Sequence, residues 1–181
     1  MEFSDALKLL QPALPKKVVA KWADLGAGEG LFTTALSHLI AEGSVIYAVD
    51  SNASALKKIK IDKKVALITI AANFEKDELP LRDLDGILMA NALHFVRNKL
   101  PFIQKIQTYL KPSGKLLLIE YDTDAPNKWV PFPISYSSCQ HLFFELGYTV
   151  EKIGEQGSVY NSAGMYAAVT QVRPLERLNG L

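Results

Sequence analysis

The sequence feature that most restricts the fold lies between Trp22 and Asp50. An apolar stretch leads into the turn Asp24-Leu25-Gly26-Ala27-Gly28-Glu29-Gly30, and a helical pattern and a second apolar stretch follow it. Glycine tolerates positive φ and lets a ligand approach the main chain closely, while the helix that starts near Gly28 presents N–H groups without partners. This pattern indicates a nucleotide-type cofactor site at the carboxyl end of a strand.

The spacing of this turn selects among nucleotide-type cofactors. A dinucleotide-binding turn needs glycine at its sixth position, counted from Gly26, and this chain has Leu31 there. Asp24 places an anion two residues before the first glycine, which suits a cationic ammonium or sulfonium better than a phosphate. Asp50 ends the next predicted strand and can accept hydrogen bonds from both hydroxyls of a ribose. A ribose without a phosphate and with a cationic appendage indicates S-adenosylmethionine (SAM).

Four motifs occur in order along the chain. They are the glycine turn, Ala48-Val49-Asp50, Ala72-Asn73-Phe74 and Leu110-Lys111-Pro112-Ser113-Gly114-Lys115-Leu116. In this order and at these approximate distances they resemble the class I SAM-dependent methyltransferases, from about Val18 to Arg173. The resemblance implies an α/β fold with a doubly wound, mostly parallel seven-stranded sheet, an antiparallel last strand and helices on both faces. It also implies that SAM is the cofactor and S-adenosylhomocysteine the product.

The predicted cofactor-binding residues follow from the turn and from the resemblance. Asn73 stands where many relatives have aspartate; its carboxamide oxygen can accept from the adenine amino group, or it can be a turn asparagine. Phe74 is expected to contact the adenine ring, and Asn91 resembles a residue that meets the methionine part of SAM, largely through its backbone. The full predicted set is Asp24, Gly26, Ala27, Gly28, Gly30, Asp50, Ser51, Asn73, Phe74 and Asn91.

His94 is the candidate catalytic residue. Methyl transfer from a sulfonium needs alignment, desolvation and, for some acceptors, removal of a proton from the nucleophile. The resemblance places the reaction mouth after the fourth strand, where His94 can act as a general base or can simply pack in the loop. The other histidines, His38 and His141, are expected on helices, in surface or packing positions.

The loop after the fifth predicted strand offers two further hypotheses. Asp122 and Asp124 can be loop acids or can bind magnesium, but the sequence names no third ligand, so no metal site is predicted. Trp129 and Phe132 stand between prolines and can either line an apolar acceptor pocket or pack locally.

The order of predicted elements supports a parallel sheet with right-handed crossovers. Residues 1–17 contain a short amphipathic helix, Phe3 to Leu10, which can be a lid or a strap packed on the sheet, and residues 174–181 are expected to form a polar tail. Strands are predicted at Val18–Leu25, Val45–Val49, Val65–Ala71, Gly86–Ala90, Lys115–Tyr121, Tyr148–Ile153 and Met165–Val172. Helices are predicted from Gly28 to Gly43, from Ser51 or Asn52 to Ile59, from Leu100 to Leu110, and from Ser135 or Ser137 to Gly147.

Composition excludes several classes of protein. The 181 residues, 49% hydrophobic and 22% charged, fit a single domain from 1 to 181. A formal net charge of +1 makes nucleic acid or an anionic membrane an unlikely partner. The amino terminus has no signal-peptide pattern, so a cytoplasmic location is expected. The single cysteine, Cys139, excludes an intrachain disulfide. The basic run Lys57 to Lys64 is expected on a solvated face, opposite the cofactor.

The sequence therefore predicts a SAM-dependent methyltransferase that acts on a small-molecule acceptor, because the insertions are too short for a further recognition domain. Two alternatives stay open. One is an NAD-dependent oxidoreductase, disfavoured by Leu31. The other is a catalytically silent SAM-binding or interaction module with the same fold. The acceptor and the oligomeric state are not readable from the sequence.

Overall fold

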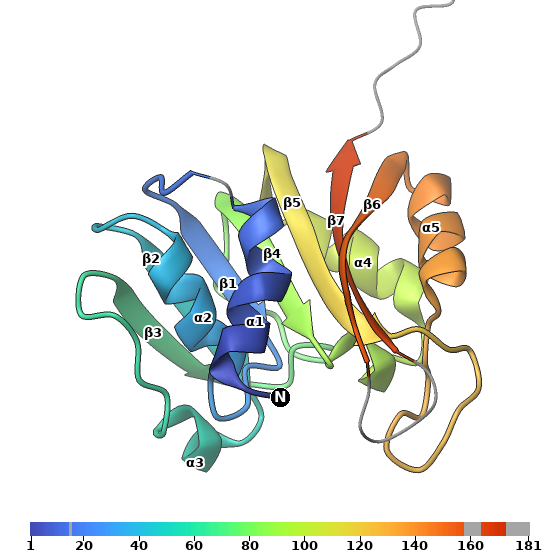
Figure 1. The fold of residues 1–181 in the computed structure, drawn as a ribbon, viewed down its shortest axis with the longest axis horizontal. Helices are drawn as coiled ribbons and strands as arrows, with labels where there is room; N and C mark the ends of the chain where they lie inside the picture. Colours follow the sequence, from blue (N-terminus) through green and yellow to red (C-terminus); the bar gives the residue numbers. More distant parts are fainter. Residues whose placement is uncertain (15, 158–163, 173–181) are drawn as a thin grey trace, which may run out of the picture.

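Seven strands form one sheet in the order β3-β2-β1-β4-β5-β7-β6 (Figure 1), and helices separate successive strands except between β3 and β4 and, in the described residues, between β6 and β7. The computed structural model describes residues 1–14, 16–157 and 164–172. Strand β7 is antiparallel to both of its neighbours, and the other pairs are parallel. The strands are β1 (Lys21–Leu25), β2 (Val45–Asp50), β3 (Ala66–Ala71), β4 (Leu84–Ala90), β5 (Leu110–Tyr121), β6 (Tyr148–Gln156) and β7 (Met165–Val172). The predicted fold class is confirmed.

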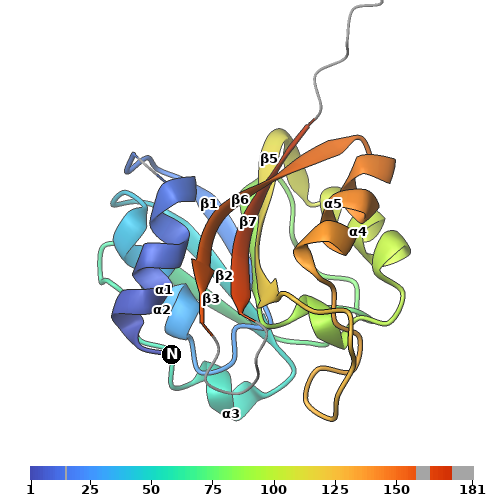
Figure 2. The same ribbon diagram turned by 45° about the vertical axis from the view of Figure 1, so that its right-hand side comes forward.

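Helices cover both faces of the sheet, so the molecule has a separate apolar core on each side. In Figure 2, α1 and α2 lie on one side of the sheet and α4 and α5 on the other. Leu10 and Leu36 belong to the first core, whereas Ile103 and Phe143 belong to the second, and all four are fully buried. The helices are α1 (Phe3–Leu10), α2 (Leu31–Leu39), α3 (Ala53–Leu56), α4 (Lys99–Gln107) and α5 (Tyr136–Glu145), with 3-10 turns η1 (Gln11–Ala13) and η2 (Leu93–Phe95).

Two predicted helices are shorter than expected. The helix after the glycine turn begins at Leu31 rather than near Gly28, and Ile40 is already extended. The next helix is a single turn that ends at Leu56, capped by the Asn52 side chain and not by Ser51. The chain then returns along α2, where the Thr34 hydroxyl donates to the carbonyl of Lys60. A tertiary contact thus replaces the helical turn that the sequence pattern favoured.

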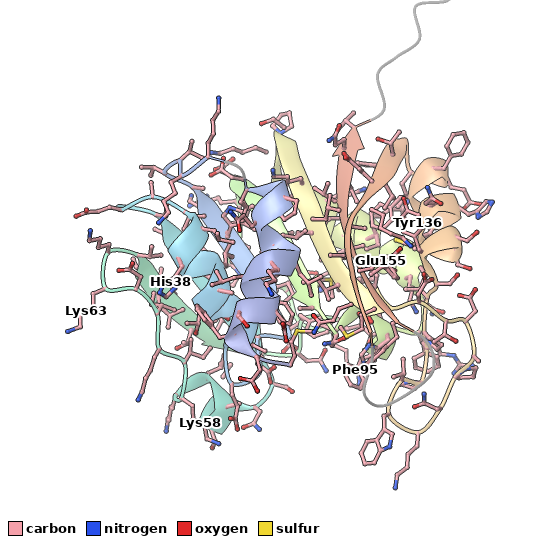
Figure 3. All side chains as sticks on the ribbon, in the orientation of Figure 1. His38, Lys58, Lys63, Phe95, Tyr136 and Glu155 are labelled. Atoms are coloured by element: carbon pink, nitrogen blue, oxygen red, sulfur yellow. The ribbon has the colours of Figure 1, made fainter. Side chains whose placement is uncertain are left out.

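The shortened α3 also changes the place of the basic run. Its member Lys58 forms an ion pair with Glu29 of the glycine turn, with 2.6 Å between Nζ and Oε1. The prediction that this run lies wholly at the end opposite the cofactor is therefore wrong. In Figure 3, Lys58 lies beside α3 at the carboxyl end of the sheet, while Lys63 projects from the outer edge next to β3.

The residues Lys111 to Gly114 follow the predicted helix end at Leu110 and precede the predicted strand start at Lys115, so a turn is expected there. This expectation is wrong, because these residues belong to β5. Leu84 pairs with Leu110, whereas Gly86 pairs with Lys115, so one residue of β4 opposes four residues of β5. A proline and a glycine in a strand commonly mark such an irregularity. The extra residues bulge out of the ladder without ending the strand.

The helix α1 packs against α2 and β6 on one face of the sheet. The ring of Phe3 meets the ring of His38 edge-on, with 5.3 Å between the centroids. Ala6, Leu9 and Leu10 are buried in the same core as α2. The packing is that of a strap on the sheet, and the lid stays a prediction. The predicted tail, 174–181, and most of the predicted loop between β6 and β7, 158–163, lie outside the described residues.

Candidate active site

The glycine turn lies at the carboxyl end of β1 and is pressed against the loop after β4. The N–H groups of Gly26 and Ala27 both donate to the carbonyl of Val49, which ties the turn to β2. Gly26 has φ of +87°, and a Cβ placed on it would lie 2.6 Å from the Cβ of Ala92. Both the backbone angle and the close approach therefore require glycine at this position.

Asp50 connects the turn to the loop that follows β2. Its Oδ2 accepts from the N–H of Gly28, and its Oδ1 accepts from the N–H of Asn52, both at 2.8 Å. Each carboxylate oxygen can accept more than one hydrogen bond, so Asp50 keeps acceptor capacity for a ligand. The side chain also lines the main cavity of the site. This geometry fits the predicted contact with two ribose hydroxyls.

Asp24 lies behind the turn, buried from solvent. Its Oδ2 accepts from the Thr33 hydroxyl of α2 at 2.6 Å. Burial raises the pKa of Asp24 to about 7; the Thr33 hydrogen bond opposes this shift and the nearby charge of Asp50 adds to it. A buried carboxyl that titrates near neutral pH is poised to respond to a cation bound beside it.

A cavity of about 320 Å³ opens at this end of the sheet. This volume lies within the range of small-molecule sites. Its walls bring together six of the predicted residues, whereas Asp24, Ala27, Gly28 and Gly30 do not line it. The lining residues are Gly26, Asp50, Ser51, Ala72, Asn73, Phe74, Glu75, Asn91, Ala92 and Phe95.

Four of the lining residues were missed by the sequence reasoning. Ala72 and Glu75 flank the Asn73-Phe74 motif, and Ala92 and Phe95 flank His94. Phe95 lies at the carboxyl end of the sheet, below β4 and β5 in Figure 3, and its side chain is half exposed. The signal available in the sequence was an aromatic residue directly after the predicted mouth residue His94.

Asn91 carries an unpaired acceptor at the cavity wall. Its backbone has φ of +53°, and its N–H donates to the carbonyl of Ile119 on β5. Its side-chain Oδ1 is buried and has no hydrogen-bond partner among the described residues. Because buried polar atoms are rarely left unpaired, this oxygen is available to a donor from a ligand or from water. The ammonium group of SAM is a donor of this kind, so the residues present fit the cofactor.

Asn73 is built into a turn. Its Oδ1 accepts from the N–H groups of Glu75 and Lys76, and its own N–H donates to Asp77. The structure thus favours the alternative of a turn asparagine, and the acceptor that was expected for adenine is already occupied. Phe74 stands next to it on the cavity wall, with its ring centroid 5.8 Å from that of Phe102.

Comparison with known proteins identifies the family of this chain. Residues 23–118, which include the turn, Asp50 and Asn91, match the family described as Methyltransferase domain. The chain belongs to the methyltransferase domain family. The predicted class of protein and its predicted cofactor, SAM, are thereby confirmed.

Individual relatives of this methyltransferase domain share about one third of its residues over part of its length. The ubiquinone/menaquinone biosynthesis C-methyltransferase UbiE of Shewanella frigidimarina is 33% identical over 108 residues, which are 57% of this chain and 43% of that protein. The match thus spans less than half the length of this curated relative.

Solved structures share the fold of the methyltransferase domain. YcgJ of Bacillus subtilis has a TM-score of 0.70 at 14% identity, covering 94% of this chain and 99% of its own. The 1,6-didemethyltoxoflavin-N1-methyltransferase of Burkholderia thailandensis, solved with that compound and S-adenosylhomocysteine bound, has a TM-score of 0.68 at 18% identity. It covers 94% of this chain and 78% of its own.

At the mouth of the methyltransferase domain, His94 and Glu120 form a buried pair. The Nδ1 of His94 lies 2.7 Å from Oε2 of Glu120, and both side chains are almost completely buried. The other carboxylate oxygen, Oε1, accepts from the N–H groups of Ala92, Leu93 and His94. The carboxylate therefore holds the loop that carries Asn91 and Phe95, and His94 lies behind the cavity wall rather than on it.

The acids after β5 have structural partners. Oδ1 of Asp122 accepts from the N–H of Tyr136, and Asp124 accepts from the N–H and hydroxyl of Ser135 and from the hydroxyl of Ser138. Both acids thereby hold the beginning of α5, with Ser135 as its capping residue. No group of three potential metal-binding side chains gathers anywhere in residues 1–14, 16–157 and 164–172.

The aromatic residues of the same loop lie outside the cavity. Trp129 is 75% exposed, and Phe132 donates its N–H to the carbonyl of His94. Phe132 thus supports the mouth loop from outside, whereas Phe74 and Phe95 are the aromatic side chains on the cavity wall. No helix in the part of the chain that the structure describes is long and apolar enough to cross a membrane.

Proposed function

We propose that this chain transfers a methyl group from SAM to a small-molecule acceptor. The observation that carries the proposal is the unpaired, buried Oδ1 of Asn91 on a cavity that Asp50 also lines. When bound, SAM supplies a methyl group already activated by a sulfonium. Asp50 accepts from the ribose hydroxyls, the Asn91 oxygen accepts from the ammonium group, and Phe74 contacts the adenine.

The remaining site residues act through these contacts. Gly26, Ala27, Gly28 and Gly30 shape the turn that lets the cofactor approach the main chain, and Ser51 borders the ribose. The buried Asp24 adds negative charge near the ammonium group. The carboxamide of Asn73 serves the turn beside the adenine, so its part in binding is to position Phe74.

His94 is proposed as the general base for acceptors that must lose a proton. If Nδ1 donates its proton to Glu120, the neutral ring keeps Nε2 as an acceptor, which is the tautomer that a base requires. The carboxylate then orients the ring and stabilises its charged form. Because His94 is buried behind the cavity wall, the proton of the acceptor has to reach Nε2 of His94 past the edge of the loop. This role therefore depends on where the acceptor lies relative to Phe95.

The acceptor is proposed to be a planar ring whose carbon attacks the methyl group, with S-adenosylhomocysteine as the leaving group. Two observations support this class of acceptor. Phe95 offers a half-exposed aromatic face at the mouth, and the relative UbiE is named a C-methyltransferase of ubiquinone and menaquinone biosynthesis. The expected cytoplasmic location and the absence of a nucleic-acid partner stay predictions.

Ligand-induced stabilisation tests the cofactor first. SAM and S-adenosylhomocysteine should raise the melting temperature, because a ligand that binds only the folded state stabilises it, whereas NAD should have no effect. Asp50→Asn should weaken SAM binding about tenfold or more, because a charge-assisted hydrogen bond contributes about 1.5–3 kcal/mol. Glu42→Gln, at an exposed position, is the matched control.

Release of S-adenosylhomocysteine in the presence of demethylated quinone-type rings then tests the reaction. Stabilisation by NAD alone would favour the oxidoreductase. Tight SAM binding without turnover across a broad panel of ring acceptors would favour the catalytically silent module.

A further inference from the structure

The sheet has two outer strands, and they differ in how they are protected. Strand β6 carries Glu151, Lys152 and Glu155, and its register shifts between Lys152 and Gly154. Charged side chains and bulges are the devices by which proteins prevent edge strands from pairing with other chains. Strand β3 reads Ala-Leu-Ile-Thr-Ile-Ala, without charge, proline, glycine or a register shift.

The open edge of β3 is accessible. Every residue of β3 is exposed or half-buried, and Ile68 has 43% of its surface exposed. The N–H of Ala66 donates to the carbonyl of Ser44, the residue before β2, and the N–H of Ala72 donates to the carbonyl of Asp50, the last residue of β2. Because alternate residues of a parallel strand bond to the same neighbour, Leu67, Thr69 and Ala71 direct their main-chain groups outward. Figure 1 shows β3 at the outer left of the sheet.

We propose that this edge is a dimer interface, occupied by β3 of a second copy of this chain in antiparallel orientation. Outward-facing residues can bond only to outward-facing residues, and a two-fold axis at Thr69, the central one of the three, is the register that lets all three of them pair. Thr69 then pairs with its own copy, and Leu67 pairs with Ala71. A two-fold interface of this kind closes on itself, and the protected β6 edges prevent further growth.

Charges beside the strand favour a second copy as the occupant. Lys63 lies in the turn before β3 and Glu75 in the turn after it, each six residues from Thr69, so antiparallel pairing places basic and acidic turns at facing ends of the two strands. Asp62 and Lys76 are related in the same way, seven residues on either side. Figure 3 shows Lys63 projecting from this edge. The sequence around β3 is thus complementary to itself when it is reversed.

Measurement of molar mass in solution, by light scattering on a sizing column, tests the proposal. The wild-type chain should have twice the 20.0 kDa of one copy. Thr69→Lys and Thr69→Glu should each be monomeric, because like charges meet across the axis. A mixture of the two variants should recover the dimer. Thr149→Lys, a matched change at an exposed position of β6, should stay dimeric.

A covalent link tests the register. Residues that face each other with paired main-chain bonds have Cα atoms about 5.5 Å apart, which a disulfide can span. Thr69→Cys should form a covalent dimer on oxidation, whereas Thr149→Cys should not, and the buried Cys139 should not react. Circular dichroism confirms that each variant is folded. A monomeric wild type, or a folded Thr69→Lys that remains dimeric, would overturn the proposal.

Discussion

At the scale of single residues, the buried ring of His94 has two separable roles, in proton transfer and in packing. His94 is held by Glu120 through Nδ1. An asparagine at this position keeps an N–H donor in nearly the same place but cannot act as a base. The variant His94→Asn therefore separates the role of the ring in proton transfer from its role in packing.

We expect His94→Asn to bind SAM with nearly wild-type affinity and to turn over about 10²-fold more slowly, because loss of a general base costs about this much. Single-turnover kinetics with an acceptor that must lose a proton measures the change. Calorimetry with SAM and the melting temperature provide the controls. An unchanged rate in the folded variant would reject the base hypothesis and leave alignment by the loop as the mechanism.

Asp24 makes stability depend on pH. Its folded-state pKa of about 7 lies above its ordinary value of 3.8, so the folded state binds the proton more tightly than the unfolded state. The resulting stabilisation is complete below pH 3.8 and is lost as the pH rises toward 7, by roughly 4 kcal/mol at about 1.4 kcal/mol per pKa unit.

Urea unfolding of the cofactor-free protein at several pH values between 5 and 8 measures this dependence. The wild type should lose stability as the pH rises, and Asp24→Asn should lose less. Parallel curves for the two proteins would show that Asp24 does not titrate in this range.

At the scale of elements, Glu120 joins β5 to the loop after β4. Its carboxylate receives three main-chain N–H groups and the His94 ring. Removal of this carboxylate leaves four buried donors without an acceptor, and breaking a buried pair in this way costs about 3–5 kcal/mol. We expect Glu120→Ala to lower the free energy of unfolding by this amount, as measured in urea. Glu151→Ala, an exposed change on the same sheet, should stay within about 0.5 kcal/mol of wild type.

At the scale of the whole molecule, α1 closes one of the two apolar cores. Leu10 is fully buried between α1 and the sheet. Leu10→Ala should destabilise the protein by about 2–5 kcal/mol, because it removes buried methyl groups and leaves a cavity. Thermal unfolding measures the loss. SAM affinity of the folded variant should stay close to wild type if α1 is a strap, whereas a large change in affinity would support the lid.

Much of the fold was predictable because it depends on local patterns. The unbroken apolar runs at β2 and β4 and the helical spacing of α1 are properties of short segments, and the glycine turn has few alternative conformations. Helix lengths were not predictable in the same way. The end of α3 depends on contacts with α2, and the extension of β5 through Pro112 depends on pairing with β4.

The site likewise depends partly on local spacing in the sequence and partly on contacts between distant residues. The sequence by itself determined the cofactor class, because the glycine turn, Leu31 and Asp50 carry chemistry that spacing alone reveals. Only the tertiary structure decided that Asn91 presents an unpaired oxygen, that Phe95 lines the cavity and that Glu120 holds His94. Hydrogen bonds between residues 26 positions apart, such as those from His94 to Glu120, arise from packing of strands whose relative register no local pattern encodes.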